Sequence, residues 1–174
     1  MSSEQAHVRP VVVEDLEAIA GIFARYVVES VATFEEVPPT VAHWRGQLDD
    51  LAARTLPFVV AEVGGEVVGY AYASPWRPKP AYRYTVEDTV YLAPEWTGKG
   101  LGRLLLDELL AACARVGVRQ MIAVIADTGD PTSAALHYAC GFVEAGRLQA
   151  VGHKHDRWVD TLLLQRDLST GGRR

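Results

Sequence analysis

A glycine-rich segment, TGKGLG at residues 97–102, is the first part of the chain that suggests chemistry. It joins a β-branched and aromatic run, residues 84–92, to a segment in which leucines recur at helical spacing. A glycine loop that opens a helix exposes backbone N–H groups, and the helix dipole puts partial positive charge behind them. The segment therefore suits a phosphate or pyrophosphate, although the same glycines would also serve a simple tight turn.

Two familiar phosphate-binding motifs do not fit this segment. A P-loop carries Lys and then Ser or Thr after its last glycine, whereas Arg103 and Leu104 follow Gly102. A dinucleotide fingerprint needs another Gly or Ala where this chain has Leu105. The sequence therefore predicts a different kind of phosphate site.

The segments around the loop predict one α/β domain over residues 1–168. Two β-rich runs around Gly64 and Gly65 predict a hairpin. Residues 120–127 form a continuous apolar run, which predicts a strand buried on both faces. The other expected elements are strands at residues 7–12 and 84–92 and in the two runs that close the chain, helices at 16–27, 41–53, 101–116 and from Pro131 to just before Gly141, and a disordered tail at 169–174.

The composition argues against several classes of protein. A formal net charge of −5 argues against an extended nucleic-acid surface. No run reaches the roughly 18 apolar residues of a membrane span, and the first residues lack a signal core. Cys113 and Cys140 have no metal-ligand spacing, which indicates reduced, buried thiols. We therefore expect a cytoplasmic protein without a metal, a nucleic-acid partner or a membrane partner.

The order of strand, glycine loop, long helix, strand, helix and Gly141–Phe142 resembles the acetyl-CoA core of the GNAT superfamily of N-acetyltransferases. Thr97 takes the position where the family signature has Gln or Arg. The similarity extends to the branch of phosphinothricin and methionine sulfoximine acetyltransferases. It is carried by TFEE at residues 33–36, WRPKPAYRYTVEDTVYL at 76–92, SAALHYACGF at 133–142 and GHKHDRWVD at 152–160.

The resemblance implies a central mixed, mostly antiparallel sheet flanked by helices, with splayed strands forming the acetyl-CoA cleft. It also implies transfer of acetyl to the α-amino group of a small amino-acid analogue. An ammonium group must lose a proton before it attacks a thioester, so a carboxylate is needed nearby. The resemblance gives this role to Glu87. Alternation along a strand sends Glu87 and Asp88 to opposite faces, and the residues alone do not say which one faces the cleft.

The resemblance also puts His137 where many acetyltransferases carry a tyrosine that protonates the departing thiolate. A histidine can donate a proton near neutral pH, and it can equally serve as a hydrogen-bonded structural residue. Ser133 lies one helical turn earlier on the same face. Tyr138 is the alternative acid.

The same resemblance assigns the acetyl-CoA contacts. Backbone groups of a strand can bind the pantetheine as they would an added strand, and the glycine loop would hold the pyrophosphate. Asp130 replaces an asparagine of the relatives, and its carboxylate accepts a hydrogen bond but cannot donate one. The expected cofactor residues are Val90, Tyr91, Leu92, Gly98, Lys99, Gly100, Leu101, Gly102, Arg103, Asp130, Ser133 and Tyr138.

For the acceptor, the proline-rich loop at residues 76–83 supplies Arg77 and Lys79 beside Tyr82. Cations suit a carboxylate and a phosphinate or sulfoximine head, although each could instead be a solvated surface charge. Phe34 and Lys154 match positions that line the same pocket in the family.

Three functional hypotheses follow from these residues and the resemblance. The leading one is acetylation of an amino-acid analogue by direct attack, in a protein that the family likeness predicts to be a homodimer. The second keeps the chemistry but takes another small amine or a peptide N-terminus. The third is a non-catalytic acyl-CoA sensor, which the presence of both Glu87 and His137 disfavours.

Overall fold

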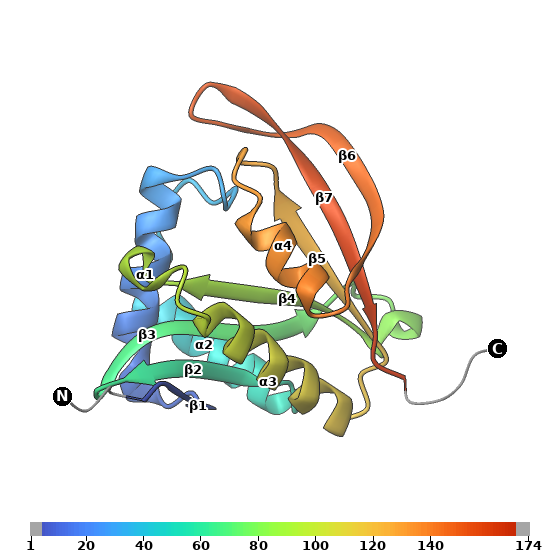
Figure 1. Ribbon diagram of the computed structural model, residues 1–174. Coiled ribbons are helices and arrows are strands. Elements are labelled where there is room, and N and C mark those ends of the chain that lie inside the picture. The colour runs from blue at the N-terminus through green and yellow to red at the C-terminus, as the bar shows by residue number, and fades with distance from the viewer. Residues whose placement is uncertain (1–4, 170–174) are drawn as a thin grey trace.

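A mixed β-sheet organises the computed structural model, which describes residues 5–169 (Figure 1). The seven strands lie in the order β1-β2-β3-β4-β5-β7-β6. Among them β4 and β5 run parallel, and every other neighbouring pair is antiparallel. The strands are β1 (His7–Pro10), β2 (Phe58–Val63), β3 (Glu66–Pro75), β4 (Thr85–Leu92), β5 (Gln120–Ala126), β6 (Val143–Lys154) and β7 (Arg157–Asp167).

Helices cover both faces of this sheet. α1 (Leu16–Glu29) and α2 (Val41–Ala53) lie behind the sheet in Figure 1, and α3 (Leu101–Arg115) and α4 (Thr132–Ala139) lie in front of it. α3 connects β4 to β5, as a parallel pair requires. None of the helices within residues 5–169 is long and apolar enough to cross a membrane.

Strand alternation gives the sheet two separate cores. Ala71 and Met121 face α3 in one core, whereas Val60 and Tyr70 face α1 and α2 in the other. Because successive side chains of a strand point to opposite faces, each core uses alternate residues of the central strands. The expected mixed, mostly antiparallel sheet flanked by helices is confirmed.

Several local expectations are also confirmed. The hairpin turns at Gly64 and Gly65, whose φ angles of 58° and 80° fit the two-residue turn that matches strand twist. α2 spans the expected residues, and the side chain of Thr40 caps it by accepting from the N–H of His43. The predicted tail at 169–174 lies outside the described residues except for Ser169, whose N–H donates to Asp167.

The expectation that residues 120–127 are buried on both faces is wrong. Met121 and Ala123 are fully buried, but the next residue, Val124, points to the other face and is 41% exposed. α3 and α4 cover one face of β5, whereas α1 and α2 pack against β2, β3 and β4 on the opposite face. An apolar run does not reveal whether a helix lies over each face, so it predicted more burial than β5 has.

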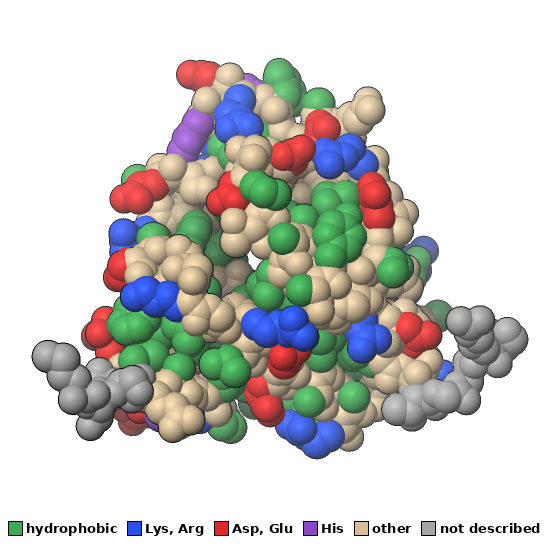
Figure 2. Space-filling model, viewed as in Figure 1, with side chains coloured by type: hydrophobic (Ala, Val, Ile, Leu, Met, Phe, Trp, Pro, Cys, Tyr) green, Lys and Arg blue, Asp and Glu red, His purple; other side chains and the backbone are tan. Residues whose placement is uncertain are grey.

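β4 and β5 separate along their length. They are paired from Thr85 opposite Gln120 to Glu87 opposite Ile122, while β4 continues to Leu92 and β5 to Ala126. β4 stays paired with β3 over this stretch. The divergence opens a space between residues 88–92 of β4 and 123–126 of β5, which we call the wedge. Figure 2, seen from the side of α3 and α4, shows a hollow near the centre of the surface.

Candidate active site

The backbone of β4 presents alternate residues to the wedge. On one edge, the carbonyl of Thr85 accepts from the N–H of Trp76 at 3.2 Å, and the N–H of Ala93 donates to Val68 at 2.8 Å. The odd-numbered residues therefore face β3, and the backbone groups of the even-numbered residues point toward the wedge. Such an open strand edge can pair with an extended molecule.

The three β4 residues expected to bind the cofactor differ in what they offer. The backbone groups of Val90 point into the wedge. The carbonyl of Leu92 already accepts from the Tyr26 hydroxyl at 2.5 Å. Tyr91 turns its backbone toward β3 and packs its ring against Phe23 and Tyr26, so it supports the strand from the face that α1 covers. Val90 is the residue best placed to contact an extended ligand.

The glycine loop has the geometry of an anion site. Gly98 and Gly100 have φ angles of 74° and 82°, a region that glycine adopts at little cost, and a β-carbon on either would meet only open space. Gly100 begins α3 without a side-chain cap, so the first N–H groups of the helix are left for another partner. Leu101 and Gly102 are buried, and a β-carbon on Gly102 would lie 3.1 Å from Leu136 of α4.

Two exposed cations flank these glycines in the sequence. The ammonium of Lys99 lies 4.5 Å from the ring centre of Trp96. The guanidinium of Arg103 pairs with Asp107 one turn further along α3, at 3.0 Å. Both charges add to the positive end of the helix dipole. The loop, the helix start and the two cations together suit a pyrophosphate.

Glu87 lies on the opposite face of the sheet from Asp88. It stands opposite Ser74 of β3 and Ile122 of β5, at the last paired position before the wedge, and it is half-buried. Burial raises the pKa of Glu87, the negative charge of Asp88 raises it further, and Arg77 opposes both. A carboxylate whose pKa is raised toward neutrality is a better proton acceptor for an ammonium group.

His137 and Asp88 form a buried pair on the α3 and α4 face. The Nε2 atom of His137 lies 2.8 Å from a carboxylate oxygen of Asp88, and its Nδ1 atom lies 2.7 Å from the carbonyl of Ser133. Burial alone would lower the pKa of His137, but the hydrogen bond and charge of Asp88, together with the hydrogen bond to Ser133, outweigh it and raise the pKa. Because His137 lies on the α3 and α4 face and Glu87 on the other, the sheet separates the two side chains. The neighbouring Tyr138 has a side chain that is 45% exposed.

A row of hydroxyl groups lies on the same face as Glu87. Tyr72 stands opposite Thr89 in the sheet. Burial raises the pKa of Tyr72, a hydrogen bond with Thr89 lowers it, and the charge of Glu87 raises it. Burial likewise raises the pKa of Tyr91, and a hydrogen bond with Thr33 opposes it. Sequence reasoning missed Tyr72, Thr89 and Thr33. The signal available for Tyr72 and Thr89 was their spacing of two along β3 and β4 from Ser74 and Glu87, whereas Thr33 lies outside both strands.

The proline-rich loop, residues 76–83, brings its cations to the surface. The guanidinium of Arg77 lies 4.1 Å from the ring centre of Trp76, and its charge acts on the pKa of Glu87. Lys79 is exposed, and its carbonyl accepts from the N–H of Tyr82 in a short 3-10 turn. The structure thus brings the charge of Arg77 near Glu87.

Phe34 and Lys154 are brought together, but they bind neighbouring parts of the chain. Lys154 is 3% exposed, and its ammonium donates to the carbonyl of Thr33 at 2.9 Å. A β-carbon on Gly152 would lie 2.3 Å from the Phe34 ring. Burial lowers the pKa of Lys154. These contacts fasten residues 31–36 to the end of the β6–β7 hairpin.

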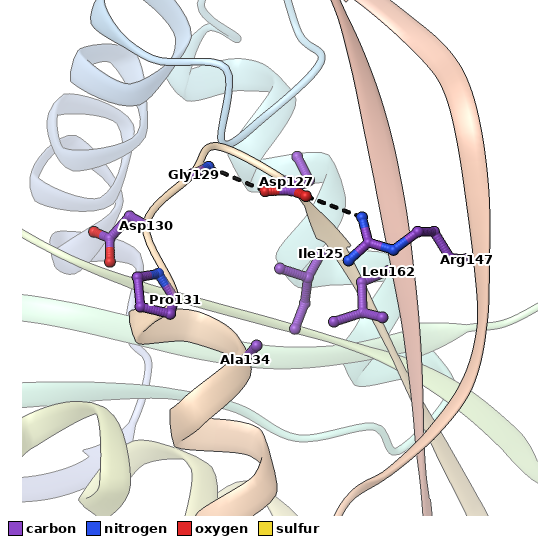
Figure 3. Close-up of a pocket in the computed structure, with 9 residues that line it drawn as sticks. Ile125, Asp127, Gly129, Asp130, Pro131, Ala134, Arg147 and Leu162 are labelled. Carbon is purple, nitrogen blue, oxygen red and sulfur yellow. Dashed lines mark hydrogen bonds and ion pairs between the residues drawn. The ribbon is translucent and has the colours of Figure 1, made fainter.

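A pocket of about 200 Å³ lies where β5 ends and α4 begins (Figure 3). Arg147 enters it from β6 and pairs with Asp127 at 2.9 Å. Asp130 points away from Arg147, and its carboxylate accepts from the N–H and the hydroxyl of Thr132, at 2.9 and 2.6 Å. Asp130 thus supports the start of α4. Among residues 5–169, no group of three or more His, Cys, Asp or Glu side chains is arranged to hold a metal ion.

A splayed parallel pair of strands, joined by a glycine loop at a helix start and carrying a half-buried carboxylate where the strands part, defines an acyltransferase of the acetyl-CoA type. The chain belongs to the acetyltransferase (GNAT) family, whose model matches residues 20–142.

Individual relatives have names that are more specific than the family. The chain is 48% identical over 164 residues to the phosphinothricin N-acetyltransferase of Alcaligenes faecalis, covering 94% of this chain and 83% of that protein. It is 36% identical to the L-methionine sulfoximine/L-methionine sulfone acetyltransferase of Pseudomonas aeruginosa, covering 94% and 95% of the two chains. A crystal structure of a phosphinothricin acetyltransferase from Sinorhizobium meliloti in complex with acetyl-CoA matches with a TM-score of 0.91 and 46% identity, covering 95% of this chain and 90% of that chain.

Proposed function

We propose that the protein transfers the acetyl group of acetyl-CoA to the α-amino group of a small anionic amino-acid analogue, of the phosphinothricin, methionine sulfoximine or methionine sulfone kind. The observation that carries this proposal is the position of Glu87, half-buried at the start of the wedge with a raised pKa and with Arg77 nearby. The activities named for the relatives supply the acceptor class.

The wedge and the glycine loop fit acetyl-CoA, which when bound supplies a thioester reactive toward amines. The backbone groups of Val90 would pair with the pantetheine, and the amides that follow Gly98 and Gly100 would hold the pyrophosphate. The open space beside both glycines supports this assignment, because a phosphate must approach their backbone closely.

Glu87 acts as the general base, directly or through a water molecule. It accepts the proton of the acceptor ammonium, and the freed amine attacks the thioester carbon directly. Arg77, Lys79 and Tyr82 bind the carboxylate and head group of the acceptor. The sheet separates Glu87 from the Asp88–His137 pair, so the base and any acid work from different faces.

The departing thiolate needs a proton or a positive charge. His137 and Tyr138 are the two candidate donors in α4. Both ring nitrogens of His137 are engaged, and Asp88 would compete for its Nε2 proton. Tyr138 has an exposed side chain. Comparing His137→Gln with Tyr138→Phe for the rate of thiol release separates the two roles.

We also propose that the enzyme works as a cytoplasmic homodimer. Val124, Val143 and Leu148 stand at register positions on the face of β5, β7 and β6 that α1 and α2 leave open, and they are 41, 64 and 47% exposed. A second copy packed there would remove this apolar surface from water. Sedimentation at micromolar concentration should give about twice the 19.0 kDa chain mass, and a clean monomer would contradict the dimer.

A thiol-release assay over a panel of amines tests the proposed function. Phosphinothricin, methionine sulfoximine and methionine sulfone should release thiol from acetyl-CoA in a reaction that Glu87→Gln nearly abolishes. Faster reaction with neutral amines or a peptide N-terminus would reassign the acceptor. Binding of acetyl-CoA without turnover of any amine would indicate a sensor instead of an enzyme.

A further inference from the structure

The carboxylate of Asp88 marks the point where the sheet opens. The last pair between β4 and β5 is Glu87 opposite Ile122, so Asp88 is the first β4 residue beyond the pairing. Its carboxylate reaches His137 of α4, the helix that follows β5, at 2.8 Å. The pair therefore connects β4 to the helix that follows β5, at the narrow end of the wedge.

The hydrogen-bond partners of His137 fix its protonation state. The carbonyl of Ser133 can only accept, so Nδ1 must donate to it. An ionised Asp88 also only accepts, so Nε2 must donate as well. Both contacts are satisfied at once by an imidazolium beside a carboxylate. The two side chains are 4% and 5% exposed, so neither charge can be solvated if its partner is lost.

The other groups packed around His137 do not compensate its charge. The ring of Phe142 meets the imidazole edge-on, with 4.9 Å between the ring centres. Cys113 of α3 lies close enough for the charge of Asp88 to add to the effect of burial in raising the pKa of its thiol, which keeps that thiol neutral. Asp88 is therefore the counter-charge of His137 on this face.

We propose that Asp88 is a positioning residue for the acetyl transfer: it holds His137 as a fixed imidazolium and ties β4 to α4 where the wedge begins. This inference rests on the proposed function for its catalytic meaning. The pair keeps the narrow end of the wedge at one width, so that Val90 and Glu87 keep their positions relative to the bound thioester.

A nuclear magnetic resonance experiment tests the charge state without turnover. In protein labelled with ¹⁵N-histidine, His137 should carry a proton on both ring nitrogens at pH 7.5. Asp88→Asn keeps an oxygen at the same place but removes the charge, so in this variant His137 should carry a proton on only one ring nitrogen at pH 7.5. A single proton on His137 in the unmutated protein would overturn the proposal.

Kinetics then test the positioning role against a matched control. Asp15 is also a buried carboxylate, paired with Arg9 at 2.8 Å on the α1 side of the molecule. We expect Asp88→Asn to lower kcat by about 10-fold or more with less than about 3-fold change in either KM, and Asp88→Ala to lower it further. Asp15→Asn should keep the wild-type kcat at a temperature where both variants are folded. Equal kcat in Asp88→Asn and Asp15→Asn would overturn the proposal.

The two proposals fail in different ways. If the unmutated protein acetylates no amine of the panel, the proposed function is wrong, and the labelled histidine still decides whether Asp88 and His137 form an ion pair. If the panel reacts but His137 is neutral, the function stands and the positioning role of Asp88 is wrong.

Discussion

The ring of Phe34 lies directly on the backbone of Gly152. A β-carbon built on Gly152 would come within 2.3 Å of the Cζ atom of Phe34, closer than any real contact. With the bond from Lys154 to Thr33, this contact holds residues 31–36 against the β6–β7 hairpin. The loop that carries Phe34, which we propose to line the acceptor pocket, therefore depends on the absence of a side chain at Gly152.

Gly152→Ala should displace Phe34 and loosen the loop at residues 31–36. We expect the KM for the amine to rise by about 10-fold, with little change in the KM for acetyl-CoA, because we propose that the displaced loop lines the acceptor pocket. Gly146→Ala is the matched control, since it lies in the same strand and an added β-carbon there meets nothing within 4 Å. Equal kinetics in the two variants would contradict this account of the loop.

Glu87→Gln should lower kcat by about 100-fold or more while the affinity for acetyl-CoA stays the same, as expected for loss of a general base. In the unmutated enzyme the rate should fall as the pH falls through the raised pKa of Glu87. Asp88→Asn removes a nearby negative charge, so it should shift this acidic limb to lower pH. Glu66→Gln, at the exposed start of β3, should change neither the rate nor the pH profile.

Gly100→Asp should weaken acetyl-CoA binding severely, because it puts a negative charge where the amides of α3 are open to phosphate. The backbone at Gly100 has a φ of 82°, so any side chain there also adds strain. Gly117→Asp controls for that strain, since Gly117 has a φ of 87° beyond the opposite end of α3. Calorimetric titration should give unchanged affinity for the second variant, and a shared loss would show that strain alone explains the first.

Arg77→Ala should lower kcat/KM for the amine by about 30-fold or more at saturating acetyl-CoA, because the acceptor loses a charged partner. Arg83→Ala is the control, since Arg83 is an exposed cation of the same loop that lies 4.7 Å from the Tyr84 ring centre. Methyl esterification of the acceptor should lower kcat/KM far more in the unmutated enzyme than in the Arg77→Ala variant. If the ester and the free acid react equally well, Arg77 does not bind the carboxylate.

The Asp88–His137 pair should also make stability depend on pH. The pKa of His137 is raised in the folded protein, so its contribution is fully present below the ordinary histidine pKa of about 6.5 and is lost as the pH rises through the raised value. Urea unfolding between pH 6 and 9 should therefore show a decline that His137→Gln lacks. An identical decline in His137→Gln would assign it to another group.

The sequence by itself determined the features that depend on near neighbours. The turn at Gly64 and Gly65, the capped start of α2, and the glycine loop before α3 are each built from residues a few positions apart, and their propensities act within that range. The resemblance of whole segments to GNAT acetyltransferases added the family and the acceptor class. The adjacency of Glu87 and Asp88 also required that they face opposite ways.

Only the tertiary structure decided which partner each of these residues meets. Asp88 meets His137 across 49 residues, and Lys154 meets Thr33 across 121. Val124 is exposed because α1 and α2, on its face of the sheet, cover β2, β3 and β4 but not β5. Local patterns carry no information on such separations, because strand register and helix placement are set by how the whole core packs.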